Sequence, residues 1–333
     1  MRFIPRNPRV NEDLLGLDCK KETSEIMSGE QIFKRVLLAI DGSLPSIIAQ
    51  ELTVFMAKKL DSNVTVLNVI SHEFTSSQFD KYIPMSYRDV PLGTGGAPEE
   101  RVSAVPTSGV QETIAAEFTM QYRQRGTEII EEAAASFKEE GISVDQMLVE
   151  HADPAEGITR VAEKGSYDLI VVGYSGEEER EPHLGSVAKK TALYAKTSVL
   201  IAREKKQISK IMVPVDGSEH SRKVVHCATI LAKKLGAEVT LLNVQEHDSP
   251  AKIMKEIGTR ILSEAAGQFE GIKLDQRLLS GDPAKTIIQT AKEGDCDLIL
   301  IGHKGHSAVS RFLLGSVSDH VIQYADRSVL LIR

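Results

Sequence analysis

Short runs of consecutive apolar, mostly β-branched residues alternate along this chain with longer stretches of helical periodicity. Such runs are typical of strands that are buried on both faces of a sheet. Strands that alternate with helices predict parallel βαβ units with right-handed crossovers. The pattern therefore predicts an α/β fold in which helices wind both faces of a parallel sheet. The runs fall at 36–40, 64–69, 169–172 and 199–201.

The chain also repeats itself. Residues 36–69 align without gaps with residues 211–244, and Asp-Gly-Ser at 41–43 recurs 175 positions later. The Asp-Pro-Ala sequence at 153–155 recurs 129 positions later. Repetition at this scale predicts two copies of one fold in tandem.

The offset between the copies falls from 175 to 129, so the first copy holds 46 extra residues. These lie within 71–125, where prolines and glycines predict a long loop, followed by an amphipathic helix over about 110–140. Residues 1–31 have no counterpart and are expected to form a loosely ordered N-terminal extension. The expected domains are therefore 32–203 and 206–333.

Composition excludes several classes of protein. The net charge of −7 argues against a protein that coats nucleic acid or an anionic membrane surface, because both tasks require a basic field. Cys19, Cys227 and Cys296 show no metal-ligand spacing, and we expect Cys227 and Cys296, which lie in apolar stretches, to be buried thiols in a reducing compartment. No signal-peptide pattern or membrane-length apolar run occurs, so a cytoplasmic protein is expected.

A cluster of glycines follows the apolar run at 298–301. Gly302 and Gly305 are expected to allow positive φ and close backbone approach just after the strand. Gly315 and Ser316 open the next helix, with Ser316 as its expected N-cap. A helix N-terminus offers N–H groups and a positive pole to phosphate oxygens. Further donors come from Lys304, Arg311, His303 and His306; the two histidines lack a third ligand, so no metal site is expected.

This segment resembles the nucleotide signature of the universal stress protein family, G-x2-G-x9-G-[S/T], which it matches position for position. The resemblance extends to Pro-Val-Asp-Gly-Ser at 214–218 and Asn-Val at 243–244 in the second copy. It implies two doubly wound, adenine nucleotide alpha hydrolase-like domains and a site for ATP, ADP or AMP, with Mg²⁺ accompanying a triphosphate. The implied nucleotide-binding residues are Pro214, Val215, Asp216, Val244, Ile301, Gly302, Gly305, Gly315, Ser316, Val317 and Ser318.

These residues also have purely structural interpretations. Asp216 and the following glycine could simply form a turn into the next helix, with Ser218 as its cap. Val215 and Val244 belong to strands in either interpretation, and Gly305 and Gly315 could be turn glycines.

The first copy carries the counterpart residues but a different loop. This loop is one residue shorter, and its four glutamates against one arginine give a formal charge of −3, compared with +2 in the second copy. Each like charge near a phosphate costs on the order of 1 kcal/mol. The site of the first copy is therefore predicted to be degenerate, unless the glutamates point to solvent or a metal ion restores binding. Its residues are Asp41, Val69, Gly173, Gly176, Gly185 and Ser186.

Three functions fit these observations. The leading one is a stress-response regulatory protein whose nucleotide occupancy is reported to an unknown protein partner. A slow ATPase is the second, although the loop offers no catalytic carboxylate and the chain has no G-x4-G-K-[S/T] motif. The third is a partner- or lipid-binding protein in which nucleotide is incidental, an alternative that the 71–125 segment keeps open.

Both copies end on an apolar strand, at 198–203 and 328–333. The resemblance implies that single-domain members pair through their last strands. We therefore expect these strands to form an intramolecular pseudo-two-fold pair, which would satisfy their edge hydrogen-bonding groups. A homodimer of the whole chain stays open.

Overall fold

The structure, a computed structural model, describes most of both copies. The expected N-terminal extension at 1–31, most of the expected loop after residue 71 and both glycine-rich loops lie outside the described part. The described residues are 32–71, 108–150, 152–175, 184–204, 207–245, 251–303 and 314–333.

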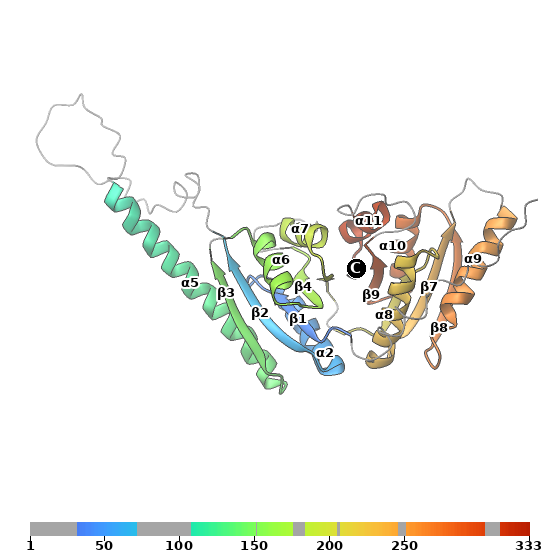
Figure 1. Ribbon diagram of the computed structural model, residues 1–333, viewed down its shortest axis with the longest axis horizontal. Helices are drawn as coiled ribbons and strands as arrows, with labels where there is room; N and C mark the ends of the chain where they lie inside the picture. Colours follow the sequence, from blue (N-terminus) through green and yellow to red (C-terminus); the bar gives the residue numbers. More distant parts are fainter. Residues whose placement is uncertain are drawn as a thin grey trace, which may run out of the picture. The chain divides into compact units, whose positions relative to one another are not determined.

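The two copies contain the same sequence of elements (Figure 1). The first copy runs β1 (Arg35–Ala39), α2 (Leu44–Leu60), β2 (Asn63–Ile70), α5 (Ser108–Glu139), β3 (Val144–Glu150), α6 (Pro154–Lys164), β4 (Leu169–Gly173), α7 (Ser186–Tyr194) and β5 (Ser198–Ala202). The second runs β6 (Lys210–Pro214), α8 (Glu219–Leu235), β7 (Glu238–Gln245), α9 (Ala251–Ala266), β8 (Leu274–Ser280), α10 (Pro283–Glu293), β9 (Leu298–Gly302), α11 (Ser316–Tyr324) and β10 (Ser328–Ile332).

Within the described residues, the strands form one ten-stranded sheet in the order β3-β2-β1-β4-β5-β10-β9-β6-β7-β8. Every neighbouring pair is parallel except β5 and β10, which run antiparallel with Leu200 opposite Leu330. The predicted doubly wound α/β fold is confirmed, and so is the predicted pairing of the two last strands. Because the sheet is continuous, residues 32–333 form a single compact unit.

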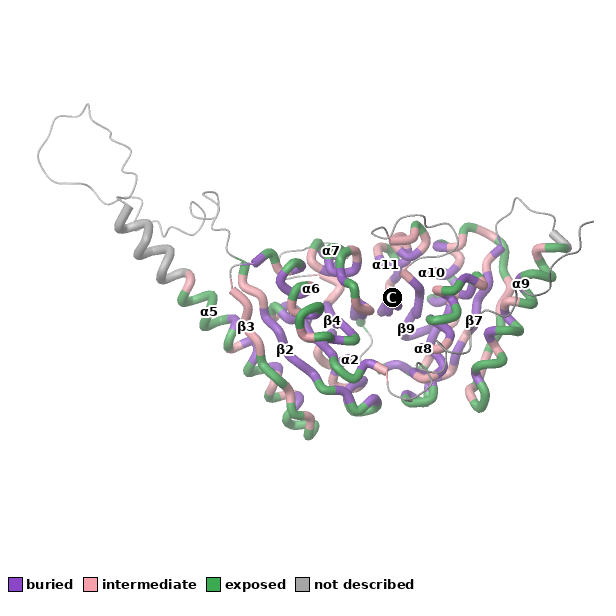
Figure 2. The backbone as a smooth tube through the Cα atoms, viewed as in Figure 1, coloured by how far each residue is buried: buried purple, intermediate pink, exposed green. Residues whose placement is uncertain are grey.

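The sheet has a separate apolar core on each face. Alternate residues of β1 divide between them: Val36 and Leu38 face α2 and α5, whereas Leu37 and Ala39 face α6 and α7. Each core continues into the second copy, where α8 and α9 cover the first face and α10 and α11 the other. Figure 2 shows the resulting pattern of buried strands and half-exposed helices. Each fully buried leucine contributes about 2 kcal/mol of transfer free energy.

The repeated Asp-Gly-Ser and Asp-Pro-Ala motifs begin helices. Ser43 and Ser218 are the N-caps of α2 and α8, and their hydroxyls accept hydrogen bonds from the backbone N–H three residues later. Asp153 and Asp282 cap α6 and α10 in the same way, with a proline at the first helical position. This proline lacks only an N–H that would have no helical partner. The two motifs thus have a structural role in both copies.

The copies differ most in the helix before their edge strand. The first copy has α5, with 32 residues, where the second has α9, with 16. The observed bounds of α5 confirm the predicted helix at 110–140. The edge strands β3 and β8 were not predicted, because their residues are mostly half-exposed or exposed and form no continuous apolar run.

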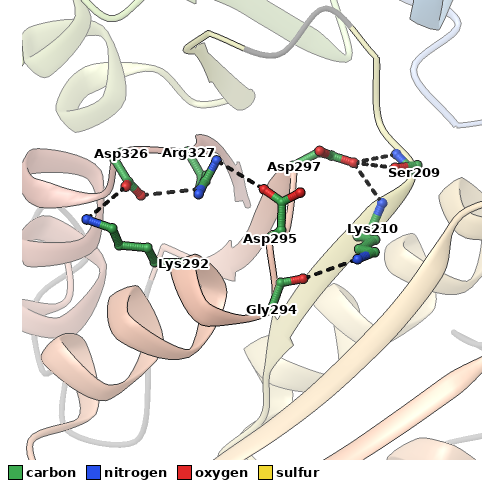
Figure 3. A network of polar contacts seen from close by, with 8 residues as sticks. All are labelled: Ser209, Lys210, Lys292, Gly294, Asp295, Asp297, Asp326 and Arg327. Atoms are coloured by element: carbon green, nitrogen blue, oxygen red, sulfur yellow. Dashed lines mark hydrogen bonds and ion pairs between the residues drawn. The ribbon is translucent and has the colours of Figure 1, made fainter.

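A network of polar contacts braces the amino-terminal ends of β6 and β9 (Figure 3). Asp297 accepts hydrogen bonds from the backbone N–H groups of Ser209 and Lys210 at 2.7 and 2.9 Å, which fixes the start of β6. Asp168 accepts one bond from Arg35 N–H at the equivalent place in the first copy. Ligands of such sheets bind at the opposite, carboxyl ends of the strands, so this network is structural.

Two of the three cysteines lie in the described part of the chain. Cys227 and Cys296 are free and buried, as predicted, and burial raises the pKa of their thiols to about 12 and about 11. In the described part, no helix combines the length and apolar character needed to span a membrane.

Candidate functional site

The Asp-Gly-Ser turn follows the first strand of each copy. Asp216 Oδ1 accepts a hydrogen bond from Ser218 N–H at 2.9 Å, and Asp41 Oδ1 accepts one from Ser43 N–H at 3.0 Å. The glycine between them has a φ of +79° at Gly217 and +82° at Gly42, a conformation that favours glycine. The turn interpretation of this motif therefore holds in both copies, and one carboxylate oxygen of each aspartate is engaged by it.

An asparagine fixes the backbone just after the first strand of each copy. Asn243 Nδ2 donates to the Val215 carbonyl at 2.7 Å, and Asn68 Nδ2 donates to the Ile40 carbonyl at 2.7 Å. Val215 is buried, whereas Val244 and Pro214 are half-buried at the ends of their strands. These asparagines were not among the predicted site residues, although Asn-Val at 243–244 was part of the resemblance to the family.

A glycine, not a serine, caps the helix that opens each predicted phosphate site. The N-caps are Gly315 for α11 and Gly185 for α7, and neither has a side-chain capping bond. The expectation that Ser316 is an N-cap is wrong, because Ser316 is already the first helical residue. The first helical hydrogen bond is donated by Asp319 N–H to the Gly315 carbonyl, so the backbone N–H of Val317 precedes the helical ladder.

Hydrogen bonds bring the two ends of each glycine-rich loop together. Gly315 N–H donates to the His303 carbonyl at 2.8 Å, and Gly185 N–H donates to the Tyr174 carbonyl at 2.6 Å. The start of the site helix is thereby held against the end of β9 or β4. The predicted site residues before and after each loop are thus brought close together. The predicted residues within the loops, Gly305 and Gly176, lie outside the described part of the chain.

The second copy has one further bond at this point. The buried Ser318 hydroxyl donates to the Gly302 carbonyl at 2.6 Å and ties the first turn of α11 to β9. The equivalent residue of the first copy is Ala188, which has no hydroxyl. Ser318 therefore orients the site helix in the second copy alone.

The glycines that end β4 and β9 have an extended backbone conformation. Gly173 and Gly302 are strand residues without positive φ, so the expectation of a positive φ is wrong for Gly302. A Cβ at Gly173 would lie 2.6 Å from the carbonyl carbon of Pro45. Glycine is needed there because the first turn of α2 passes close to the strand.

The first copy contains a formed cavity at the carboxyl ends of its strands. Its volume is about 510 Å³, within the range of about 300–1,000 Å³ that is common for small-molecule sites. Most of its lining is apolar, and five of the six residues predicted for this site line it: Asp41, Val69, Gly173, Gly185 and Ser186. Loss of nucleotide binding by this copy stays a prediction. It rests on the charge and length of the loop, because the cavity itself is formed.

One ion pair joins the two helices beside this cavity. Lys190 Nζ of α7 lies 2.9 Å from Asp153 Oδ2, the N-cap of α6. The hydrogen bond from Lys190 lowers the pKa of Asp153. The second copy has His320 at the position of Lys190. Among the described residues, no three histidine, cysteine or acidic side chains gather in a way that could hold a metal ion.

The comparisons with known proteins agree with this architecture. The chain is 32% identical to universal stress protein YxiE of Bacillus subtilis, over 38% of this chain and 99% of that protein. It is 22% identical to universal stress protein Slr1230 of Synechocystis over 90% of this chain and 100% of that protein. The crystal structure of a universal stress protein from Archaeoglobus fulgidus shares the fold, with a TM-score of 0.63 and 22% identity over 90% of this chain and 98% of that chain.

The family model described as "Universal stress protein family" matches residues 97–203 and, separately, 207–333. The second match spans the second copy, the first covers the first copy from residue 97 onward, and together they cover more than half of the chain. The chain therefore belongs to the universal stress protein family.

Proposed function

We propose that this protein is an adenine-nucleotide-binding regulatory protein of the stress response, and that the C-terminal copy holds the nucleotide. Within this proposal the two domains are 32–203 and 206–333, and Mg²⁺ accompanies a bound triphosphate. Occupancy of the site would be read by a protein partner.

The observation that carries the proposal is the start of α11. Its glycine cap leaves the helix N-terminus without a side-chain cap, and two hydrogen bonds hold this N-terminus at the carboxyl end of β9. Backbone N–H groups and the positive pole of the helix dipole favour phosphate oxygens at such a place. It also lies at the switch in strand order between β6 and β9, where ligands of doubly wound sheets bind.

The two copies differ in the charge of the glycine-rich loop and not in the geometry of the strand ends. The first copy has a cavity of a suitable size, so its strand ends provide no reason to exclude a nucleotide. Its loop carries a formal charge of −3, while that of the second copy carries +2. A triphosphate would be repelled by the first loop and attracted by the second.

Identification of the ligand is the first test. The full chain, purified under native conditions, is denatured, and the released small molecules are identified by mass spectrometry. ATP, ADP and AMP are then titrated, together with cAMP, because one universal stress protein has been solved in complex with cAMP. An adenine nucleotide that binds the chain supports the proposal, and the absence of binding by all four contradicts it.

A matched pair of substitutions locates the site. Aspartate is a favourable N-cap, and the φ values of −64° at Gly315 and −60° at Gly185 accommodate any residue, so both helices should still form. In Gly315→Asp the carboxylate occupies the phosphate position, and nucleotide affinity should fall at least 100-fold. The control Gly185→Asp should change affinity less than twofold, and the opposite result would assign the nucleotide to the first copy.

The regulatory role also predicts slow hydrolysis. The C-terminal loop sequence has no carboxylate to act as a catalytic base. Steady-state turnover of ATP should therefore remain far below the ~1 s⁻¹ that is typical of enzymes. Turnover at enzyme-like rates that is lost in Gly315→Asp would identify the protein as an ATPase instead.

A further inference from the structure

The last strand of each copy ends in an arginine that reaches the other copy. β5 and β10 are antiparallel, so the residue after each strand lies beside the start of its partner. Arg203 N–H donates to Ser328 Oγ at 3.0 Å, and Arg333 N–H donates to Ser198 Oγ at 3.4 Å. These two arginines are equivalent residues, and so are the two serines.

The guanidinium groups then bind the C-terminal ends of helices. Arg333 Nη2 donates to the carbonyls of Ala192 and Leu193 in α7, at 2.6 and 3.2 Å. Arg203 Nη2 donates to the carbonyl of Ile322 in α11 at 3.4 Å. Carbonyls in the last turn have no intrahelical partner and carry the negative pole of the helix, which favours a cation.

The same two helices form the candidate sites at their other ends. Gly185 and Ser186 at the start of α7 line the cavity of the first copy, and Gly315 and Ser316 open the proposed nucleotide site. Each helix has nine residues, which corresponds to a length of about 14 Å. A helix this short moves as one rod, so a contact at one end fixes the position of the other.

Simple stabilisation explains these arginines poorly. Arg203 is 7% exposed, and burial lowers the pKa of both guanidinium groups. The Nε atoms of both are buried and have no hydrogen-bond partner among the described residues. Apolar replacement of a buried, incompletely bonded charge is often neutral or stabilising.

Arg203 also touches the loop of its own copy. Its guanidinium lies 4.8 Å from the ring centroid of Tyr174. The Tyr174 carbonyl accepts the hydrogen bond from Gly185 N–H that closes this loop. Arg203 thus contacts Tyr174, which closes the loop of the first copy, and also helix α11 of the second copy.

We propose that Arg203 and Arg333 are positioning residues that act across the two copies. Arg203 holds α11 in place for the nucleotide site of the C-terminal copy, and Arg333 holds α7 in place for the cavity of the N-terminal copy. The nucleotide site is then incomplete without a residue from the other copy. The effect on affinity rests on the proposed function, whereas the effect on the helices does not.

The test uses the full chain with Arg203→Met and Arg333→Met as a matched pair. Methionine keeps an apolar stem but removes the charge and the donors. Affinity for ATP should fall about fivefold in Arg203→Met, near the lower end of ordinary coupling between sites, and change less than twofold in Arg333→Met. Arg203→Lys retains the cation at the end of α11 and should recover most of the loss.

Hydrogen–deuterium exchange supplies a readout without ligand. Amides of α11 (Ser316–Tyr324) should exchange faster in Arg203→Met, and those of α7 (Ser186–Tyr194) in Arg333→Met. A global loss of stability would raise exchange to the same extent in both helices, and that result would overturn the proposal. Equal loss of ATP affinity in the two variants would also overturn it. If the unaltered chain binds no nucleotide, the proposed function fails, and the exchange pattern still decides the positioning role.

Discussion

In the N-terminal copy Asn68 bonds the Ile40 carbonyl, and in the C-terminal copy Asn243 bonds the Val215 carbonyl at the same distance of 2.7 Å. Both copies also share the aspartate turn and the backbone hydrogen bond that closes the glycine-rich loop. The copies differ where a phosphate would lie, in loop charge and in the hydroxyl of Ser318. The strand-end geometry is common to both copies, so a difference in nucleotide binding between them would have to arise in the loop and at the start of the site helix.

The largest expected effect comes at the junction, where the copies are alike. Leu200 and Leu330 lie opposite each other in the register of β5 and β10, and both are fully buried. Leu200→Ala and Leu330→Ala should each lower the free energy of unfolding by about 2–5 kcal/mol. Because the sheet and both cores are continuous, chemical denaturation should show one transition. Two separate transitions would show that the copies fold independently.

The next effect tests whether the loop decides between the copies. Replacement of residues 177–184 by residues 306–314 restores the family spacing and changes the loop charge from −3 to +1. A second nucleotide should then bind per chain, at least about tenfold more tightly than any binding to the unaltered N-terminal copy, which corresponds to about 1.4 kcal/mol. Isothermal titration measures both quantities. An unchanged stoichiometry would place the defect outside the loop.

A smaller effect is expected from the one hydroxyl that distinguishes the site helices. Ser318→Ala removes the bond to the Gly302 carbonyl and should cost about 1 kcal/mol of stability, together with a several-fold loss of nucleotide affinity. The matched control Ala188→Ser changes the other copy and should leave affinity unaltered. Thermal unfolding and titration provide the readouts, and unchanged affinity in Ser318→Ala would contradict a role of this bond.

The smallest effect concerns the ion pair that only the N-terminal copy has. Asp153→Asn keeps a good N-cap but loses the pairing with Lys190. Since Lys190 lowers the pKa of Asp153, the pair stabilises the protein above about pH 4, and this contribution disappears as the pH falls. At pH 7 the melting temperature should drop by at most about 2 °C, and this drop should shrink as the pH falls through the lowered pKa of Asp153. Asp282→Asn in the other copy controls for the cap.

The buried strands could be predicted because residues such as Val36–Ile40 are covered on both faces and form continuous apolar runs. The edge strands β3 and β8 could not, since they lie at the two ends of the sheet that the described residues form and their residues are partly exposed. Helix α5 was recognised from its amphipathic pattern almost to its observed ends.

The candidate site was predictable in its spacing but not in its detail. Ser316 resembles an N-cap by residue type, yet Gly315 occupies that position. The need for glycine at Gly173 depends on Pro45, which lies far away in the sequence. Arg203 and Arg333 each contact a helix of the other copy only because the two copies pair through β5 and β10. No local sequence pattern predicts such a contact.

Two copies of one framework are proposed to carry one nucleotide between them. Titration of the unaltered full chain with ATP and Mg²⁺ by isothermal calorimetry measures the number of nucleotides bound. We expect one nucleotide per chain, which Gly315→Asp abolishes and Gly185→Asp preserves. Two equivalent sites per chain, or binding that survives Gly315→Asp and is lost in Gly185→Asp, would contradict this proposal.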